Sequence, residues 1–563
     1  MAVSGTLITR EYRNFRGVDF SQRKDEVSLF RSPDALNMWK NYKNRNGLCV
    51  ETRPDIELLK EYSNTIFGLF FYTYNNEKHT IVHSGNELYD NDKLIFENMA
   101  SNKSNFFVYG PNLYIMDGTQ YLVYNGTEVK AVEGYIPTTT IGKAPAGNGT
   151  KYEDMNLLIG IRKNAFSGDG ESKAYQLDVE SFDTDYTVRV WVNDVETTAF
   201  TTDSSKGIVT FNEAPGIPGT VGQDNVIIQF KKDVEGYKYR INKCTLVEVF
   251  DNRIFFSGNP DYPNMLWHCS LNDPTYCSDL DYYEEGINDS KVKALVSGNN
   301  ALWVFKEPSQ TNTTVFYHNP TIDADYGKIY PSTHSSISTG CVATGINFND
   351  DICFFSDRGM EAISGDVTTE QTLAHRSAVI DSRLLNENNY KNLILEEWEG
   401  YLLVIVDNKV YLADSRLMFT NGNHKEYEWF YWEFDKNINC THVDNGVLYL
   451  CSENEIYTLT KTNTSINSYW TTLEDEFDYP HYQKTTNKKG CVVDLEGEEV
   501  NVAVKTDNNN FEDINRYKNT KGFVVARIKK KKWKSIQLKF YSTKHFGLYS
   551  STLESYVGSY VKR

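Results

Sequence analysis

The chain has 563 residues, with 58 Lys or Arg against 76 Asp or Glu, and its formal net charge is −18 at pH 7. This length predicts more than one domain, and the acidic balance argues against a surface that coats nucleic acid and favours protein partners. Because no window approaches roughly 18 consecutive apolar residues, we expect no membrane span. The start, MAVSGTLITREYRNF, lacks the basic and apolar regions of a secretory signal, so none is expected.

Residues 1–60 show neither a helical nor a strand period and predict an irregular N-terminal arm. Ser32, Pro33 and Asp34 before Ala35 have the residue types that start a short helix. The arm carries Phe15, Phe20 and Trp39, which would expose apolar area if they were left uncovered. We therefore expect the arm to lend a strand to another sheet or to lie against a neighbouring subunit.

A repeated phrase dominates the middle of the chain, in which a polar turn is followed by a run of apolar residues. The phrase is seen in Asp251–Phe256 and returns around Leu302, Ile352, Leu402 and Leu448, with spacings of 48, 50, 50 and 46 residues after Ile254. Such a period, with several short strands per unit, is typical of β-propeller blades. Candidate hairpins near Leu69 and Leu113 raise the count to seven.

The repeat is interrupted and then ends. Residues 141–150 are typical of a linker, and residues 151–235 contain short alternating strands that predict an inserted β-sandwich. The predicted fold is all-β: a β-propeller of six or seven blades with an inserted β-sandwich and a C-terminal β-sandwich. The expected domains are the arm at 1–60, first blades at 61–140, the insert at 151–235, further blades at 236–464 and the C-terminal sandwich at 465–563.

Several groups of residues could suggest chemistry, and each has a simpler structural interpretation. Asp279, Asp281, Glu284 and Glu285 could pair as in a glycoside hydrolase, but acids in a loop more often form a solvated face. The turn at 356–359 (SDRG) favours a hairpin, because the aromatic residue of the sialidase turn is absent. His268, Cys269 and Cys277 lack the spacing of a zinc site, and the nine cysteines are expected to be buried thiols. We predict no catalytic residue, cofactor or metal.

The run 527–534 (RIKKKKWK) is the one strongly basic stretch in this acidic chain. In one interpretation its lysines lie on the solvent face of an edge strand and prevent aggregation. In the other, Lys530, Lys531, Lys532 and Trp533 meet an acidic partner or passing DNA. Together with Phe15, Phe20 and Trp39, these four residues are the predicted interface residues.

Three phrases carry a resemblance to a known family. They are Arg13–Phe20 with Ser32–Met38, Arg253–Pro260 with Asp281–Tyr283, and Ser535–Phe540 with Phe546–Tyr549. The chain resembles the bacteriophage stabilisation protein or tail tubular protein B family, which forms the tail nozzle of short-tailed phages. The resemblance spans most of the chain, rests on structural phrases and offers no catalytic residue. It implies six blades, whereas seven candidate hairpins are counted.

The resemblance implies a structural subunit of the virion tail or neck, assembled in the host cytoplasm and located in the virion. Its expected partners are further copies of itself in a ring, expected to be a hexamer, and the portal, adaptor and other tail proteins. DNA would pass through the ring without sequence-specific binding, and an acidic lining would not adhere to phosphates. The alternative is a receptor-binding or glycan-binding tail protein, or a depolymerase, that uses the propeller face.

Overall fold

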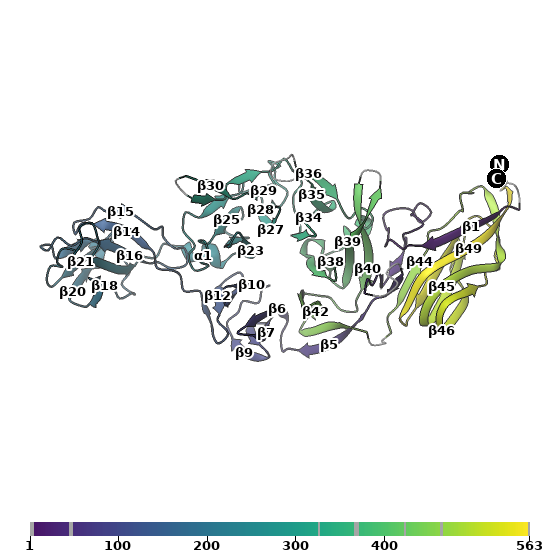
Figure 1. Ribbon diagram of the computed structural model, residues 1–563, viewed down its shortest axis with the longest axis horizontal. Coiled ribbons are helices and arrows are strands. Elements are labelled where there is room, and N and C mark those ends of the chain that lie inside the picture. The colour runs from purple at the N-terminus through teal and green to yellow at the C-terminus, as the bar shows by residue number, and fades with distance from the viewer. Residues whose placement is uncertain are drawn as a thin grey trace. The chain divides into compact units, whose positions relative to one another are not determined.

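The computed structural model describes residues 5–43, 49–324, 327–364, 371–421, 424–461 and 465–560. Strands dominate, and the two α-helices found in these ranges, α1 (Tyr237–Asn242) and α2 (Asp381–Leu384), are short (Figure 1). Neither they nor any other described helix has the length and apolarity that a membrane crossing requires. The chain divides into two compact units, residues 72–338 and residues 1–71 with 339–563.

The unit at 72–338 contains four-stranded meanders in which each strand pairs with the next along the chain, except that a small hairpin precedes the last strand of the fourth meander. They are β6 (Ile66–Tyr74, which begins before this unit), β7 (Glu77–Ser84), β8 (Glu87–Asp90) and β9 (Lys93–Phe96); β10 (Asn105–Tyr109), β11 (Asn112–Met116), β12 (Tyr121–Tyr124) and β13 (Val129–Ala131); β23 (Leu246–Phe250), β24 (Arg253–Ser257), β25 (Met265–His268) and β26 (Tyr282–Glu284); β27 (Val292–Gly298), β28 (Ala301–Lys306), β29 (Val315–His318) and β32 (Ser332–His334). The small hairpin β30 (Thr321–Asp323) and β31 (Gly327–Ile329) precedes β32. This strand order is that of propeller blades.

The other unit contains three more meanders. They are β33 (Gly345–Phe348), β34 (Asp351–Ser356), β35 (Gly359–Ser364) and β36 (Thr372–His375); β37 (Ile394–Trp398), β38 (Tyr401–Val406), β39 (Lys409–Asn421) and β40 (His424–Glu433); β41 (Cys440–Asp444), β42 (Val447–Ser452) and β43 (Glu455–Thr460), completed by β5 (Asp55–Glu61) from the arm. The described residues thus supply seven blades, one more than the family resemblance implies. The fold is a β-propeller with two sandwich modules, as predicted.

Local turn chemistry explains why the repeated phrase forms a hairpin. The two residues between the first and second strands have positive φ at Asp251-Asn252, Asn299-Asn300, Asn349-Asp350, Glu399-Gly400 and Asn445-Gly446. Two consecutive residues with positive φ make a type I′ turn, whose twist matches that of the strands. The equivalent apolar positions on each second strand are buried; they are Ile254, Leu302, Ile352, Leu402 and Leu448.

The insert is a two-layer sandwich whose boundaries differ from the prediction. Its strands are β14 (Thr138–Lys143), β15 (Thr150–Lys151), β16 (Ile161–Phe166), β17 (Ala174–Gln176), β18 (Arg189–Val192), β19 (Val195–Thr197), β20 (Phe200–Asp203), β21 (Ile208–Phe211) and β22 (Val226–Lys231). The sheet β15-β14-β16-β22-β18-β19 packs on the sheet β17-β21-β20 around a core that includes Phe166, Tyr175 and Phe230. The predicted linker at 141–150 is wrong, because β14 pairs in parallel with β16 and belongs to the sandwich.

The C-terminal sandwich is built on one long, shared hairpin. It comprises β44 (Ser468–Thr471), β45 (Tyr482–Thr506), β46 (Glu512–Ala526), β47 (Lys531–Trp533), β48 (Ile536–Ser542) and β49 (Phe546–Tyr560). The first half of β45 pairs with β49 and its second half with β48, while β46 pairs along its other side. β48 and β49 thus share one side of β45, at different positions along it.

The arm is woven into these sheets. Its strands β1 (Leu7–Arg13), β2 (Ala35–Leu36), β3 (Met38–Trp39) and β4 (Val50–Thr52) belong to the same sheet as β37–β40 and β44–β49. Specifically, β1 runs beside β49 (Figure 1), β2 pairs with β44, and β3 and β4 connect β40 to β49. The expected helix after Ser32 is wrong because Ala35 is drawn into β2. The expectation that the arm lends a strand is confirmed by the pairing of β5 with β43.

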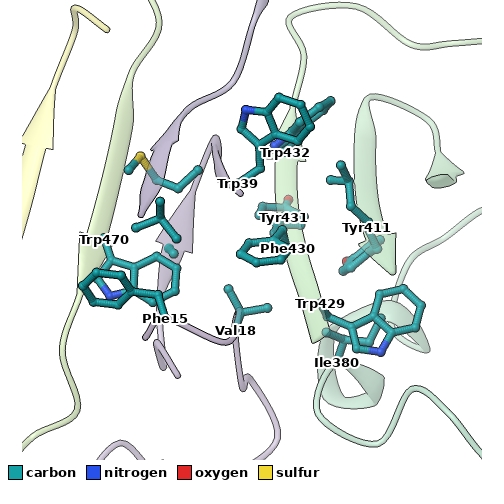
Figure 2. Packing of buried hydrophobic residues seen from close by; sticks show 14 of the residues in the cluster. Phe15, Val18, Trp39, Ile380, Tyr411, Trp429, Phe430, Tyr431, Trp432 and Trp470 are labelled. Atoms are coloured by element: carbon teal, nitrogen blue, oxygen red, sulfur yellow. The ribbon is translucent and has the colours of Figure 1, made fainter. Parts of the chain in front are cut away.

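Aromatic side chains fill the junction between the arm, blade β37–β40 and the sandwich (Figure 2). Trp39 stacks on Trp398 with ring centroids 5.4 Å apart and meets the edge of Trp432 at 5.4 Å. Phe15 meets Trp470 of β44 edge-on at 5.1 Å. Burying a large aromatic side chain typically contributes about 1.5–3 kcal/mol, so the arm is a substantial part of this core.

Gly17 sets how closely the arm approaches β40. Its φ is +85°, and a Cβ there would lie 2.1 Å from the carbonyl oxygen of Trp429, while the next residue, Val18, donates its N–H to that carbonyl. We predict that Gly17→Ala lowers the free energy of unfolding by about 3 kcal/mol or more, from backbone strain plus overpacking. Gly5→Ala is the matched control, because Gly5 also has positive φ but open space around it. Chemical denaturation of both variants tests this, and equal losses would contradict it.

Candidate assembly surface

Three of the predicted interface residues are buried inside the chain. Phe15 and Trp533 are 1% exposed and Trp39 is 4% exposed. Trp533 lies edge-on to Phe477 at 5.5 Å, and its indole N–H donates to Thr486 Oγ1 at 3.2 Å. The prediction that these rings meet a partner is therefore wrong. The arm covers its own aromatic residues because its strands pair with sheets of the same chain.

Phe20 is only half-buried and marks where the arm rests on α2. The Arg383 guanidinium lies 3.7 Å from the centroid of its ring, and Tyr431 meets the ring edge-on at 5.8 Å. The backbone is held as well, since Phe20 N–H donates to Val379 O and Ser382 Oγ donates to Phe20 O. Phe20 thus belongs to a docking contact within the chain, and an interface role for it is not supported.

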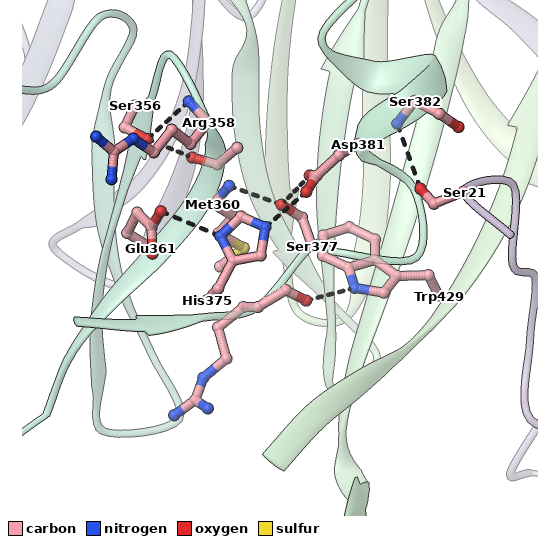
Figure 3. Close-up of polar contacts among 12 residues, drawn as sticks. Ser21, Ser356, Arg358, Met360, Glu361, His375, Ser377, Asp381, Ser382 and Trp429 are labelled. Atoms are coloured by element: carbon pink, nitrogen blue, oxygen red, sulfur yellow. Dashed lines mark hydrogen bonds and ion pairs between the residues drawn. The ribbon is translucent and has the colours of Figure 1, made fainter. Parts of the chain in front are cut away.

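A charged network lies next to this docking point (Figure 3). His375 bonds two carboxylates, Glu361 Oε1 through Nδ1 at 3.1 Å and Asp381 Oδ2 through Nε2 at 2.6 Å. These bonds, that to Asp381 above all, raise the pKa of His375 to about 10. Ser377 Oγ donates to the other oxygen of Asp381 at 2.6 Å and accepts the Met360 N–H. Ser377 and His375 thus both bind Asp381, and we call this group the clamp. The Ser377 hydroxyl does not point at the imidazole, as a catalytic nucleophile would.

The clamp predicts a pH dependence of stability. The pKa of His375 is about 10 in the folded chain and 6.5 in the reference state. The stability that the protonated imidazole gives the folded chain is therefore complete below pH 6.5, and it disappears as the pH rises through 10. We expect Asp381→Asn to remove most of this decline, because the amide still accepts from Ser377 Oγ but carries no charge. Glu361→Gln should remove less of it. Denaturation curves across this pH range provide the measurement, and a variant with the wild-type slope would contradict the assignment.

The basic run lies at the edge of the C-terminal sandwich. Lys531 and Lys532 are exposed on β47, while Lys530 is half-buried and bonds Glu512 at 2.5 Å. Beneath them Lys484 is fully buried, donates to the carbonyls of Tyr479, Tyr482 and Lys534, and has its pKa lowered to about 8 by burial. Lys531 and Lys532 are thus exposed at a strand that pairs with β45 alone, which both interpretations of the run require.

β46 presents the longest open strand edge of the described residues. It extends over 15 residues and pairs with β45 alone. Phe523 and Val525 point outward and are 74% and 48% exposed, on a strand that also carries Arg516, Lys518 and Lys521. Residues 512–534 contain nine Lys or Arg against two acids, so this edge is basic in a chain with net charge −18. An unpaired edge with exposed apolar side chains is a template for strand addition. The sequence did not predict this open edge, because the alternation of residues along β46 does not show that one side of the strand lacks a pairing partner.

Substitutions should separate the buried and exposed parts of the basic run. We predict that Trp533→Ala lowers the free energy of unfolding by about 3–5 kcal/mol, because the ring is buried. The double variant Lys531→Glu/Lys532→Glu should change it by less than about 0.5 kcal/mol, because both side chains are exposed. Denaturant titration measures both, and a large loss in the double variant would show that the lysines stabilise the sandwich.

The acids considered for catalysis have different surroundings in the structure. Glu285 is fully buried and bonds His318 Nε2 at 2.9 Å and Ser332 Oγ at 2.7 Å. Burial raises the pKa of Asp281 to about 6. Asp279 accepts a hydrogen bond from the Tyr237 hydroxyl at 3.2 Å, whereas Glu284 is exposed. The four acids therefore differ in burial and in hydrogen-bond partners.

The cysteines are structural in their surroundings. All nine are free and buried, as predicted. Cys244, Cys269 and Cys277 share a core cluster with Trp267, and burial raises the pKa of each thiol. Within the described ranges, no group of three or more His, Cys, Asp or Glu side chains is arranged to hold a metal.

Comparisons with known proteins give fold-level likeness only. No family model and no curated protein matches the chain. Among solved structures, BamB from Moraxella catarrhalis is 10% identical, with 73% of this chain and 97% of that chain covered and a TM-score of 0.31. A family 43 arabinoxylan arabinofuranohydrolase from Bacillus subtilis is 11% identical over 87% and 96% of the two chains, with a TM-score of 0.20. An exo-β-1,3-galactanase from Phanerochaete chrysosporium is 8% identical over 55% and 94%, also with a TM-score of 0.20. Scores this low support no functional inference.

Proposed function

We propose that this protein is a structural subunit of a bacteriophage tail or neck, assembled with further copies of itself into a ring below the portal. The observation that carries the proposal is the open edge of β46, with Phe523 and Val525 exposed beside basic side chains. The basic side chains of this edge oppose pairing with another basic edge, whereas the exposed Phe523 and Val525 favour a partner that covers them. The rest of the chain, which is strongly acidic, supplies complementary charge on a neighbouring copy.

The sequence phrases that resemble the tail nozzle family supply residues of the buried core. Phe15, Val18 and Met38 from the arm and Leu538 and Phe540 from β48 are buried in one common core. A family that conserves its scaffold, and not a catalytic group, would carry its resemblance in residues of this kind. The proposed passage of DNA through the ring is taken from this resemblance.

A receptor-binding or glycan-degrading tail protein is the alternative function. The two proposals differ in stoichiometry and in chemistry. A ring subunit forms closed oligomers of defined copy number and occupies the tail or neck in electron micrographs of virions. A depolymerase cleaves host-surface glycan as an isolated protein, so such turnover by purified protein would overturn the structural proposal.

The β46 edge makes the ring proposal testable with point substitutions. We expect Phe523→Lys/Val525→Lys to prevent oligomer formation without changing the melting temperature, because both side chains lie on an exposed face and lysine blocks strand addition. Val221→Lys is the matched control, since Val221 is a fully exposed valine in the insert. Native mass spectrometry and sedimentation measure the oligomer. Unchanged oligomers in the double variant would exclude β46 as the contact.

A further inference from the structure

A cavity of about 420 Å³ lies at the root of the insert, within residues 72–338. Its walls come from two segments, 155–162 where the chain enters β16 and 231–239 where it leaves β22. Leu157, Leu158 and Ile159 supply apolar surface, and Tyr237 and Tyr239 supply aromatic surface. This volume and this mixed lining are typical of small-molecule sites, which span about 300–1,000 Å³.

The walls are held in place by backbone contacts and do not need a ligand to form. Gly160 allows the two segments to approach, since a Cβ there would lie 2.1 Å from Asp233 Oδ1 and 2.9 Å from its Cα. Lys232 N–H donates to Gly160 O at 2.9 Å. The buried Asn156 ties the floor to the neighbouring blade by donating to the carbonyls of Tyr135 and Thr275.

Arg162 places a buried positive charge in this wall. It is 6% exposed, and its guanidinium carbon lies 5.4 Å from the centroid of the Phe230 ring. Its Nη1 donates to Met155 Sδ at 2.6 Å, but its Nε is buried without a hydrogen-bond acceptor, and Asp178 Oδ1 lies 3.8 Å away. A buried donor without an acceptor is costly, and such a group in a cavity wall indicates a missing partner.

The lysines that line the cavity differ from Arg162 in their surroundings, since Lys238 is exposed and lies over the Tyr239 ring at 5.3 Å. Lys231 pairs with Asp185 and Asp233, and Lys232 donates to Ser181 O and lies 3.8 Å from Asp183. Arg162 is therefore the buried cation of this wall that keeps a donor, its Nε, without an acceptor. One guanidinium suits a single carboxylate, which it can hold through two parallel bonds.

We propose that this cavity binds a ring-shaped ligand that carries one carboxylate, of the class of the hexuronic acids, with the carboxylate on Arg162. The apolar and tyrosine walls fit the face of a sugar ring, and the Tyr237 hydroxyl beside Asp279 offers a polar contact for ring hydroxyls. The site lies at the base of the insert, so it is distinct from the β46 edge and does not depend on the proposed assembly role.

Calorimetry on the purified full chain tests the proposal with galacturonate and glucuronate as probes, galactose and glucose as neutral counterparts, and inorganic phosphate as a second anion. We expect saturable binding of a hexuronate in the millimolar range or better, and at least about tenfold weaker binding of the neutral sugars and of phosphate. Arg162→Met should weaken hexuronate binding by about tenfold or more, since it keeps the volume and removes the charge. Arg189→Met is the matched control, because Arg189 pairs with Glu196 on the exposed face of the insert.

A second variant keeps the test decisive if Arg162→Met fails to fold. Val234 lines the cavity and is 38% exposed, so Val234→Trp should obstruct the site without disturbing the core. Loss of hexuronate binding in this variant, with an unchanged melting temperature, supports the proposal. No binding of either hexuronate to the wild-type chain, equal binding of neutral sugars, or full affinity in Val234→Trp would overturn it.

Discussion

The pairing of β3 and β4 between β40 and β49 is the constraint on which the unit at 1–71 and 339–563 depends. Two strands of two and three residues connect the blade β37–β40 to the C-terminal sandwich, so that strands from both modules belong to one hydrogen-bonded sheet. A sheet that continues across a junction fixes the register of both sides, because a shift of one residue would turn every side chain to the opposite face. The buried rings of Trp39 and Trp432 add packing to a connection that the backbone already specifies.

This constraint changes the role of the arm. A free arm with exposed aromatic residues would be a natural tether to a neighbouring subunit. Here its strands β1 and β5 complete sheets of the same chain, and its aromatic residues are covered by Trp470 and Trp398. Because the arm is occupied within the chain, the assembly that we propose uses other surfaces, such as the side of β46 that faces away from β45.

The parts of the fold that local chemistry determines could be predicted from the sequence. Turns such as Asn299-Asn300 and Asn445-Gly446 specify their own conformation, so the blades and their spacing could be recognised without knowing any partner. The arm could not be placed in this way, because Phe15 meets a residue more than 400 positions later and β2 has only two residues. The limits of the insert were missed because β14 directly follows Pro137 and pairs with β16 across the predicted linker.

The candidate sites show the same division between local and distant information. Phe523, Val525 and the basic run are visible in the sequence as composition, but their exposure depends on β45 covering one side of β46 and leaving the other open. The clamp at His375 and the cavity at Arg162 combine segments that no local pattern relates. In the sequence Arg162 is an ordinary polar residue of an alternating strand, and only the pairing of β16 with β22 shows that its Nε is buried without an acceptor.

Buried charges within the arm show how one arrangement is selected over its alternatives. Lys40 is 2% exposed and bonds Glu428, which is 1% exposed, and Arg31 donates to Glu426 at 3.0 Å. Burying such pairs costs desolvation that their attraction only partly offsets, so they add little to stability. Docking the arm in a shifted register would leave at least one of these charges buried without its partner, at a cost of about 3–5 kcal/mol. Apolar packing therefore supplies most of the stability of the arm, and these ion pairs determine which register it adopts.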